Sequence, residues 1–263
     1  MLSDRGSRPA LAWRAVADHE SCFILLVVAT FVLIPGAGSD PEVYRATIHE
    51  LRGLGYDALA PPLPLDDPDA RPSDHATAVA SATPARGDIV VVAQSLGAFA
   101  GPLVADRVGA ALLVLLAPMV PAPGETAGEW WQNTRHAEAV TGLLERYGPM
   151  SEWSEEAAHE VFLHDVDPDV ARAAKRFNGV PGSGMFTEPW PHESWPDIPT
   201  RVLCPRDDRL FPWDFQQRVV RERLGLDLDE IAGGHLPMLS RPAELAQRLV
   251  DLCTEQVLMY GTS

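Results

Sequence analysis

The serine at position 95 lies in a segment whose residue types suit a catalytic nucleophile. The apolar run Ile89–Val92 predicts a buried strand, and an alanine-rich stretch starting at Leu96 predicts a helix directly after the serine. A nucleophile elbow needs this order of strand, serine and helix, with small residues two positions before and two after the serine. Gly97 fits, and Ala93 is one methyl larger than the glycine of G-x-S-x-G. We expect Ser95 to be a nucleophile rather than a structural residue of a turn.

A serine hydroxyl is a weak nucleophile and needs a base that is held by a third group. Where a serine sits on such an elbow, the acid follows in the chain and the histidine follows the acid. His235 comes after the last predicted strand, and the two glycines before it let a loop bring its imidazole back over the sheet. Asp207 and Asp208 follow an earlier strand. Asp208 is the preferred acid, because it stands four residues before Pro212, the usual spacing of this loop, and Asp207 is the alternate.

The tetrahedral intermediate of acyl transfer also needs donors for its oxyanion. One donor is the backbone N–H of Leu96, next to the predicted nucleophile. The other should come from the loop Pro35–Ser39, where we favour Ala37 and place Gly38 next. A glycine-containing loop after a first strand could instead bind a dinucleotide, but the third glycine of G-x-G-x-x-G is absent and Pro41 follows at once. No metal or cofactor is implied.

Short apolar runs alternate with amphipathic stretches along the chain, which predicts an α/β fold with a mostly parallel sheet. The predicted strands are Thr30–Ile34, Asp57–Ala60, Ile89–Ala93, Ala111–Leu116, Arg201–Cys204 and Leu226–Ile231. The predicted helices are Pro41–Leu54, Asp74–Ala82, Leu96–Val108, Asp214–Leu224 and Pro242–Gln256. The proline-rich stretch Pro61–Pro72 is predicted to be a surface loop, since proline continues neither element.

More than 80 residues separate the strand ending at Leu116 from the one starting at Arg201, far more than a plain crossover needs. Helical patterning at Thr126–Arg146 and Ser154–Arg176 predicts that residues 119–196 form a helical cap over the carboxyl ends of the strands. Residues 29–118 and 197–263 then form the core.

The cap segment contains five of the seven tryptophans. We expect Trp130 and Trp131 to face the substrate pocket. The alternative is that the tryptophans only attach the segment to the body, the commoner use of large aromatic side chains.

Residues 1–28 are predicted to be an N-terminal extension outside the core. The apolar run Phe23–Ile34 is shorter than the about 20 residues that a membrane-spanning helix needs. Its acidic flank and the lack of a small-residue cleavage site also disfavour a signal peptide. We hypothesise that the functional chain begins near Val28, and we expect a soluble, cytoplasmic protein.

The charge balance restricts the partners. The chain of 263 residues has 21 basic and 37 acidic side chains, a formal net charge of −16. This balance disfavours nucleic acid and anionic membranes and suits a small neutral or apolar substrate. Cys22, Cys204 and Cys253 are widely spaced, which predicts reduced thiols rather than disulfides or a zinc site. We expect a monomer or homodimer.

From about residue 29 to 256 the chain resembles the α/β-hydrolase superfamily, and within it the branch that holds plant methylesterases and hydroxynitrile lyases with related bacterial hydrolases. The segments that carry the resemblance are Val32–Ala37, Gln94–Gly97, Leu116–Pro121, Phe162–Asp165 with Pro168 and Ala171, and Gly234–Leu245. We expect the substrate to contact residues in or beside these segments, namely Gly36, Gly38, Gln94, Met119 and Leu236, together with Trp130 and Trp131.

The departures from the family pattern refine this resemblance. Pro35 stands where the family usually has histidine, so the hydrogen bonds that organise the oxyanion loop should differ here. Hydroxynitrile lyases of this branch carry lysine at the position of Leu236 and threonine at that of Gly36, so both positions agree with the esterases. Epoxide hydrolases and dehalogenases have aspartate at the position of Ser95, so the serine argues against these two classes of enzyme.

Together these features predict a serine hydrolase that cleaves a small, hydrophobic carboxylic ester through an acyl-enzyme. A lactonase, a thioesterase or a biosynthetic enzyme of intramolecular acyl transfer or cyclisation could use the same residues. A lyase that uses the triad as a base and a ligand receptor with little turnover are the remaining alternatives.

Overall fold

A fully parallel sheet forms the centre of the molecule. The computed structural model describes residues 29–85, 87–177 and 182–260, and in this part of the chain six strands pair in the order β2-β1-β3-β4-β5-β6. The strands are β1 (Ala29–Ile34), β2 (Asp57–Leu59), β3 (Asp88–Gln94), β4 (Leu112–Leu116), β5 (Thr200–Pro205) and β6 (Asp229–Ile231). The predicted α/β class and each predicted strand are confirmed, although β6 is shorter than predicted.

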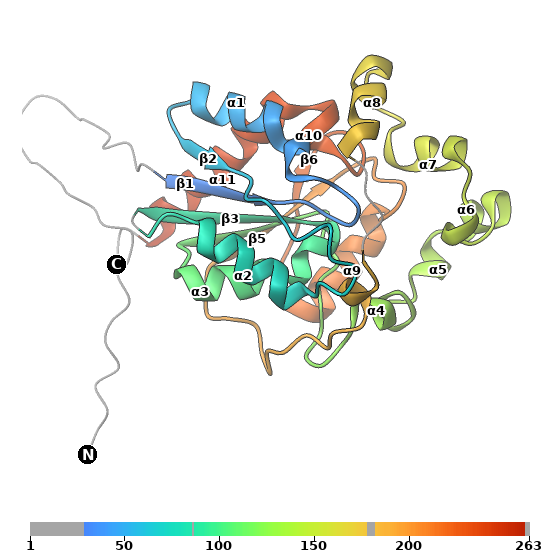
Figure 1. The fold of residues 1–263 in the computed structure, drawn as a ribbon, viewed down its shortest axis with the longest axis horizontal. Helices are drawn as coiled ribbons and strands as arrows, with labels where there is room; N and C mark the ends of the chain where they lie inside the picture. Colours follow the sequence, from blue (N-terminus) through green and yellow to red (C-terminus); the bar gives the residue numbers. More distant parts are fainter. Residues whose placement is uncertain (1–28, 86, 178–181, 261–263) are drawn as a thin grey trace, which may run out of the picture.

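Helices cover both faces of this sheet. Figure 1 shows α1 and α11 on one face and α2 and α3 on the other. The elements of the body are η1 (Pro41–Tyr44), α1 (Arg45–Gly53), α2 (Pro72–Ala82), η2 (Ser95–Phe99), α3 (Gly101–Val108), α9 (Trp213–Leu224), α10 (Pro237–Ser240) and α11 (Pro242–Tyr260).

Strand side chains alternate between two hydrophobic cores. Val32 and Val91 belong to the core under α2, α3 and α9, whereas Leu33 and Val92 belong to the core under α1 and α11. Both faces of the central strands β1, β3 and β4 are therefore buried, which explains why these strands read as continuous apolar runs in the sequence.

The strand order reverses at β1. From β1 the chain first adds β2 on one side, and then β3 to β6 follow on the other side. Such a switch leaves a crevice at the carboxyl ends of the two strands that flank it, here β1 and β3. Ile34 at the end of β1 pairs in register with Ala93 of β3. The loop after β1 and the turn after β3 are thereby brought together.

The long segment between β4 and β5 is helical but broken. Its elements are α4 (Ala127–Asn133), α5 (His136–Ala139), α6 (Thr141–Tyr147), η3 (Met150–Glu152), α7 (Glu155–Phe162), α8 (Pro168–Ala174), η4 (Lys175–Phe177) and η5 (Ser183–Phe186). Figure 1 shows α5 to α8 grouped at one end of the sheet. The two predicted stretches are divided because Arg135 is left-handed, with φ 52°, and Asp167 caps a new helix at Pro168. The division into core and cap stays a prediction.

Smaller differences concern the ends of elements. The helix predicted from Pro41 begins as a 3-10 turn, and the one predicted from Leu96 begins as the 3-10 turn at Ser95. Pro72 starts α2 instead of ending the preceding loop, because proline is tolerated in the first helical turn. The predictions about residues 1–28 lie outside the described residues. None of the described helices combines the length and the apolarity needed to cross a membrane.

Candidate active site

Ser95 occupies a strained turn between β3 and η2. Its φ is 51°, in the left-handed region that non-glycine residues rarely adopt. Its carbonyl oxygen accepts a hydrogen bond of 3.0 Å from the N–H of Met119, which follows β4, and this ties the turn to the neighbouring strand. A strained serine between a strand and a helix is the backbone geometry of a nucleophile elbow.

Three small residues let the elbow pack closely. A Cβ on Gly97 would lie 2.6 Å from the carbonyl oxygen of Pro35, so only glycine fits without movement. Ala93 stands where the elbow pattern has its first glycine, and its methyl group faces Gly101 of α3, where an added Cβ would lie 2.4 Å from it. The methyl of Ala93 is therefore accommodated because the facing helix has a glycine.

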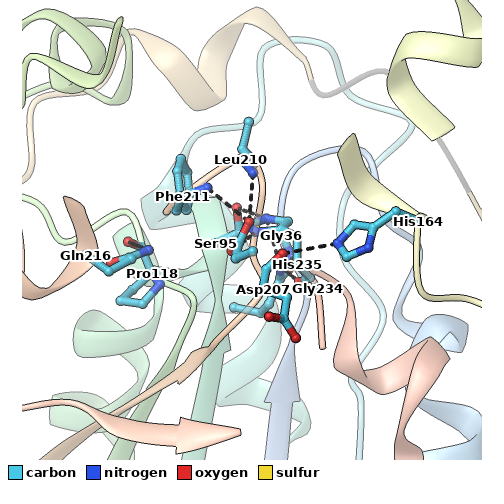
Figure 2. A network of polar contacts seen from close by, with 12 residues as sticks. Gly36, Ser95, Pro118, His164, Asp207, Leu210, Phe211, Gln216, Gly234 and His235 are labelled. Atoms are coloured by element: carbon cyan, nitrogen blue, oxygen red, sulfur yellow. Dashed lines mark hydrogen bonds and ion pairs between the residues drawn. The ribbon is translucent and has the colours of Figure 1, made fainter. Parts of the chain in front are cut away.

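The structure brings Ser95, His235 and Asp208 together in one chain of hydrogen bonds. His235 Nε2 lies 3.1 Å from Ser95 Oγ, and His235 Nδ1 lies 2.7 Å from Asp208 Oδ2. Asp208 Oδ1 accepts hydrogen bonds from the N–H groups of Leu210 (2.9 Å) and Phe211 (3.0 Å), and Figure 2 labels these two donor residues. All three functional side chains are buried. The carboxylate is held by the backbone on one side and holds the imidazole on the other.

Asp207, the alternate acid, has a different place. Asp207 is exposed. Its N–H donates to the carbonyl oxygen of Gly233 at 3.0 Å, and its Oδ2 accepts a hydrogen bond of 3.4 Å from the N–H of Gly233. His164 Nε2 lies 3.1 Å from its carbonyl oxygen. Asp207 thus ties the loop after β5 to the histidine loop, while its neighbour contacts the imidazole.

The loop that carries His235 is fixed from the segment between β4 and β5. Asp165 Oδ2 accepts a hydrogen bond of 2.9 Å from the N–H of Gly234, and a Cβ on this glycine would lie 2.9 Å from Asp165 Oδ1. The rings of Phe162 and Phe211 pack edge-on against the imidazole, with centroids 5.7 and 5.1 Å away. The role of Asp165 was not predicted, although the resemblance includes the motif that contains it.

Gln94 connects the oxyanion loop to the imidazole. Its Oε1 accepts a hydrogen bond of 2.7 Å from the N–H of Gly36, which fixes the orientation of the amide. Its Nε2 donates to the carbonyl oxygen of His235 (3.3 Å) and lies 3.2 Å from His235 Nε2. Gly36 is needed here, since a Cβ would lie 2.5 Å from Gln94 Oε1 and 2.8 Å from Ser95 Cβ. Gln94 therefore supports the loop where the family's histidine is replaced by Pro35.

Two backbone N–H groups beside Ser95 are available to a ligand. Among the described residues, no hydrogen bond engages the N–H of Ala37 or of Leu96. Gly38 has φ 71°, a conformation that favours glycine, and allows the tight turn after Ala37. Gly36, Ala37, Gly38 and Leu96 all line one cavity of about 200 Å³. The loop after β1 and the elbow after β3 thus present two donors at one cavity wall.

Other residues that we expected to contact the substrate are Met119, Leu236 and Gln94. Met119 is buried, and its backbone N–H donates to the carbonyl oxygen of Ser95. Leu236 is half-buried and packs against the core under α1 and α11. Gln94 is engaged by Gly36 and His235, as described above, so its amide acts on the protein itself.

The burial of Trp130 disagrees with the expectation that Trp130 and Trp131 face the substrate pocket. Trp130 is 0% exposed, its indole N–H donates to the carbonyl oxygen of Val120 at 2.9 Å, and its ring packs against Phe211 and Phe215. Trp131 packs edge-on against Trp130. Trp130 is thus a core residue that attaches α4 to the body, because burial with a satisfied N–H leaves nothing to offer a ligand.

The thiols of Cys204 and Cys253 are free and buried. Burial raises the pKa of Cys204 well above its usual range and that of Cys253 to about 11, so both are protonated at neutral pH. In the same residues no group of three or more His, Cys, Asp or Glu side chains is arranged to hold a metal ion.

Comparisons with known proteins agree with this geometry. A model described as the alpha/beta hydrolase family matches residues 31–248. The alpha/beta hydrolase nvfD of Aspergillus novofumigatus is 25% identical over 241 residues, which cover 83% of this chain and 94% of that protein.

Solved structures share the fold. Polyneuridine aldehyde esterase matches with a TM-score of 0.70 at 17% identity, covering 86% of this chain and 99% of its own. A pyrethroid hydrolase from Sphingobium faniae JZ-2 matches with a TM-score of 0.61 at 21% identity, covering 85% and 96%. An extracellular hydrolase from a Paenibacillus species, described as homologous to tobacco salicylic acid binding protein 2, matches with 0.69 at 18% identity, covering 85% and 98%.

Proposed function

The chain belongs to the alpha/beta hydrolase family, and from this premise we propose that it hydrolyses a small, apolar carboxylic ester through an acyl-enzyme formed on Ser95. The observation that carries the proposal is the unbroken chain of hydrogen bonds from the Ser95 hydroxyl through His235 to Asp208, at 3.1 and 2.7 Å. A nucleophile, a base and an orienting acid in this arrangement are the requirements of serine acyl transfer.

In the first step His235 acts as the base. Asp208 accepts the hydrogen bond of Nδ1–H, so Nε2 carries the lone pair that faces the Ser95 hydroxyl. Ser95 Oγ attacks the ester carbonyl carbon as Nε2 takes its proton, and the adjacent carboxylate stabilises the imidazolium. When the tetrahedral intermediate collapses, the bond to the alkoxy group breaks and the imidazolium returns its proton to the leaving alcohol.

In the second step His235 takes a proton from water, whose oxygen attacks the acyl-enzyme. When the second intermediate collapses, the bond between the acyl carbon and Ser95 Oγ breaks, the imidazolium returns its proton to Oγ, and the carboxylic acid is released. In both steps the N–H groups of Ala37 and Leu96 stabilise the oxyanion, an effect that is large because the donors are fixed before the charge develops. Every group used in these steps belongs to the chain or to the two substrates.

The proposed substrate class rests on charge and on similarity. A net charge of −16 disfavours an anionic substrate by long-range repulsion. Proteins with the same fold include polyneuridine aldehyde esterase and pyrethroid hydrolases, whose names describe the hydrolysis of organic compounds. An uncharged ester with an apolar part suits both observations.

Active-site labelling with turnover tests the proposal. We expect a fluorophosphonate to label the wild-type protein and p-nitrophenyl acetate to be hydrolysed, and Ser95→Ala to lose both. Ser73→Ala is the matched control, because the Ser73 hydroxyl also contacts a carboxylate, Glu188 Oε1 at 2.7 Å, as part of another contact network. Equal labelling of Ser95→Ala and wild type would contradict the proposal. Labelling of Ser95 without ester hydrolysis would favour intramolecular acyl transfer.

A further inference from the structure

The cavity beside the two free N–H groups is lined mainly by apolar side chains. Its volume is about 200 Å³, and it extends from the oxyanion loop to the loop before α2. Its apolar lining includes Ile34, Leu63, Leu65, Leu96, Ala100 and Met185. A dry apolar cavity of about 150 Å³ is large enough to bind benzene. The space therefore suits one ring-sized apolar group.

Three ionisable side chains also line the cavity, and of these His75 is buried whereas Asp66 and Asp67 are exposed. His75, from α2, lines the cavity and is 7% exposed. No hydrogen bond to its ring is found among the described residues, in contrast to His235 and His136, whose ring nitrogens have partners at 2.7 Å. Burial lowers the pKa of His75, so at neutral pH its ring offers one N–H donor and one acceptor nitrogen.

The cavity is connected to the proposed chemistry by its wall. Gly36 contacts Ser95 so closely that an added Cβ would lie 2.8 Å from Ser95 Cβ, and Gly36 also lines the cavity. Ala37 and Leu96, whose N–H groups face the reacting carbonyl in the proposed mechanism, line it as well. Ser95 itself does not line the cavity, but the residues that flank its hydroxyl group in the proposed mechanism form part of the cavity wall.

We propose that this cavity is a specificity subsite for an uncharged, ring-sized group of the ester that carries a hydroxyl group, and that His75 recognises this hydroxyl. A hydroxyl is both a donor and an acceptor, which matches a neutral imidazole. Asp66 and Asp67, exposed at the same cavity, disfavour a negatively charged group. The inference rests on the proposed function, since it assigns the substrate class of the same site.

The experiment compares matched esters that differ in one group. In the acyl arm, p-nitrophenyl phenylacetates carry a hydroxyl or a methyl group at ring position 3 or 4. In the alcohol arm, acetates of 2-phenylethanol carry the same groups. The arms show which side of the ester enters the cavity. In wild type we expect kcat/KM for one hydroxyl ester to exceed that for its methyl counterpart at least about tenfold.

Two variants and one control examine the cavity itself. His75→Leu should reduce the hydroxyl-to-methyl ratio to about one, because the hydroxyl loses its partner. Leu65→Trp, at a partly exposed position of the lining, should lower the ratio of ring esters to p-nitrophenyl acetate at least about tenfold by filling the space. His49→Leu replaces an exposed histidine of α1 and should leave both ratios unchanged.

The outcomes separate the two proposals. If wild type hydrolyses p-nitrophenyl acetate through Ser95 but shows no hydroxyl preference in either arm, the subsite is wrong and the function stands. A preference that survives His75→Leu also overturns it. If His75→Leu does not fold, an unchanged ring-to-acetate ratio in Leu65→Trp overturns it instead. If wild type shows no Ser95-dependent hydrolysis of p-nitrophenyl acetate, the proposed function itself is wrong.

Discussion

Replacing Gln94 with leucine should impair catalysis without removing any residue of the triad. The change deletes the acceptor of the Gly36 N–H at 2.7 Å and the amide group that lies 3.2 Å from His235 Nε2. A fully buried N–H left without a partner costs about 1–3 kcal/mol, and the half-buried N–H of Gly36 should cost less than the upper end of this range. We expect the loop to relax toward another acceptor, which moves the adjacent N–H of Ala37 away from the oxyanion.

The magnitude follows from what one oxyanion donor contributes. Complete loss of such a donor lowers kcat about 10²–10³-fold. Leu96 keeps its donor, and Ala37 is displaced rather than removed, so we expect kcat to fall about 10–100-fold, or about 1.4–2.7 kcal/mol. KM should change less than about threefold, because the donors act mainly on the transition state.

Steady-state kinetics with p-nitrophenyl acetate measures this effect. Gln216→Leu is the matched control: this glutamine is equally buried, and its amide donates to the carbonyl oxygen of Pro118 at 3.3 Å. A folded Gln94→Leu with unchanged kcat, or with a raised KM and unchanged kcat, would refute the reasoning.

Three further predictions concern stability, measured by urea unfolding. Gly101→Ala should destabilise the fold by about 1–3 kcal/mol, because the new methyl group clashes with that of Ala93. Adding Ala93→Gly should restore the stability of this variant, and additive effects of the two substitutions would contradict the prediction. Burial lowers the pKa of His136, so the unfolded chain binds a proton that the folded chain does not, and stability falls as the pH drops below about 6.5. His136→Gln should flatten this slope by up to about 1.4 kcal/mol per pH unit, and equal slopes would argue against it. Glu125→Gln should cost about 3 kcal/mol because it leaves the half-buried charge of Arg223 without its partner, and a loss below about 1 kcal/mol would mean that the pair contributes little.

The sequence predicted the sheet and the positions of the polar side chains at its edge. Runs such as Ile89–Val92 are long and apolar enough to be strands only in a sheet that is covered on both faces, and the structure confirms this. Because the carboxyl ends of parallel strands share one edge, chain order alone placed Ser95, Asp208 and His235 near one another, and the structure brings them to hydrogen-bonding distance.

Side-chain direction is what the sequence could not supply. Trp130 reads as a pocket residue from its place in a long insert, but its contacts with Phe211 and Phe215 decide its burial. His75 lies on a helix whose sequence gives no sign of a cavity. The left-handed residue Arg135 breaks a pattern that appears continuous, because a single φ is set by tertiary packing rather than by local propensity.

The proposed mechanism depends on acylation of Ser95 during turnover. Its most direct test is intact-protein mass spectrometry of the enzyme quenched within milliseconds of mixing with p-nitrophenyl acetate, followed by peptide mapping. We expect an added acetyl mass on the peptide that contains Ser95, a matching burst of p-nitrophenol, and neither signal in Ser95→Ala. Full turnover with the acetyl group on another residue, or an undiminished burst in Ser95→Ala, would contradict the mechanism.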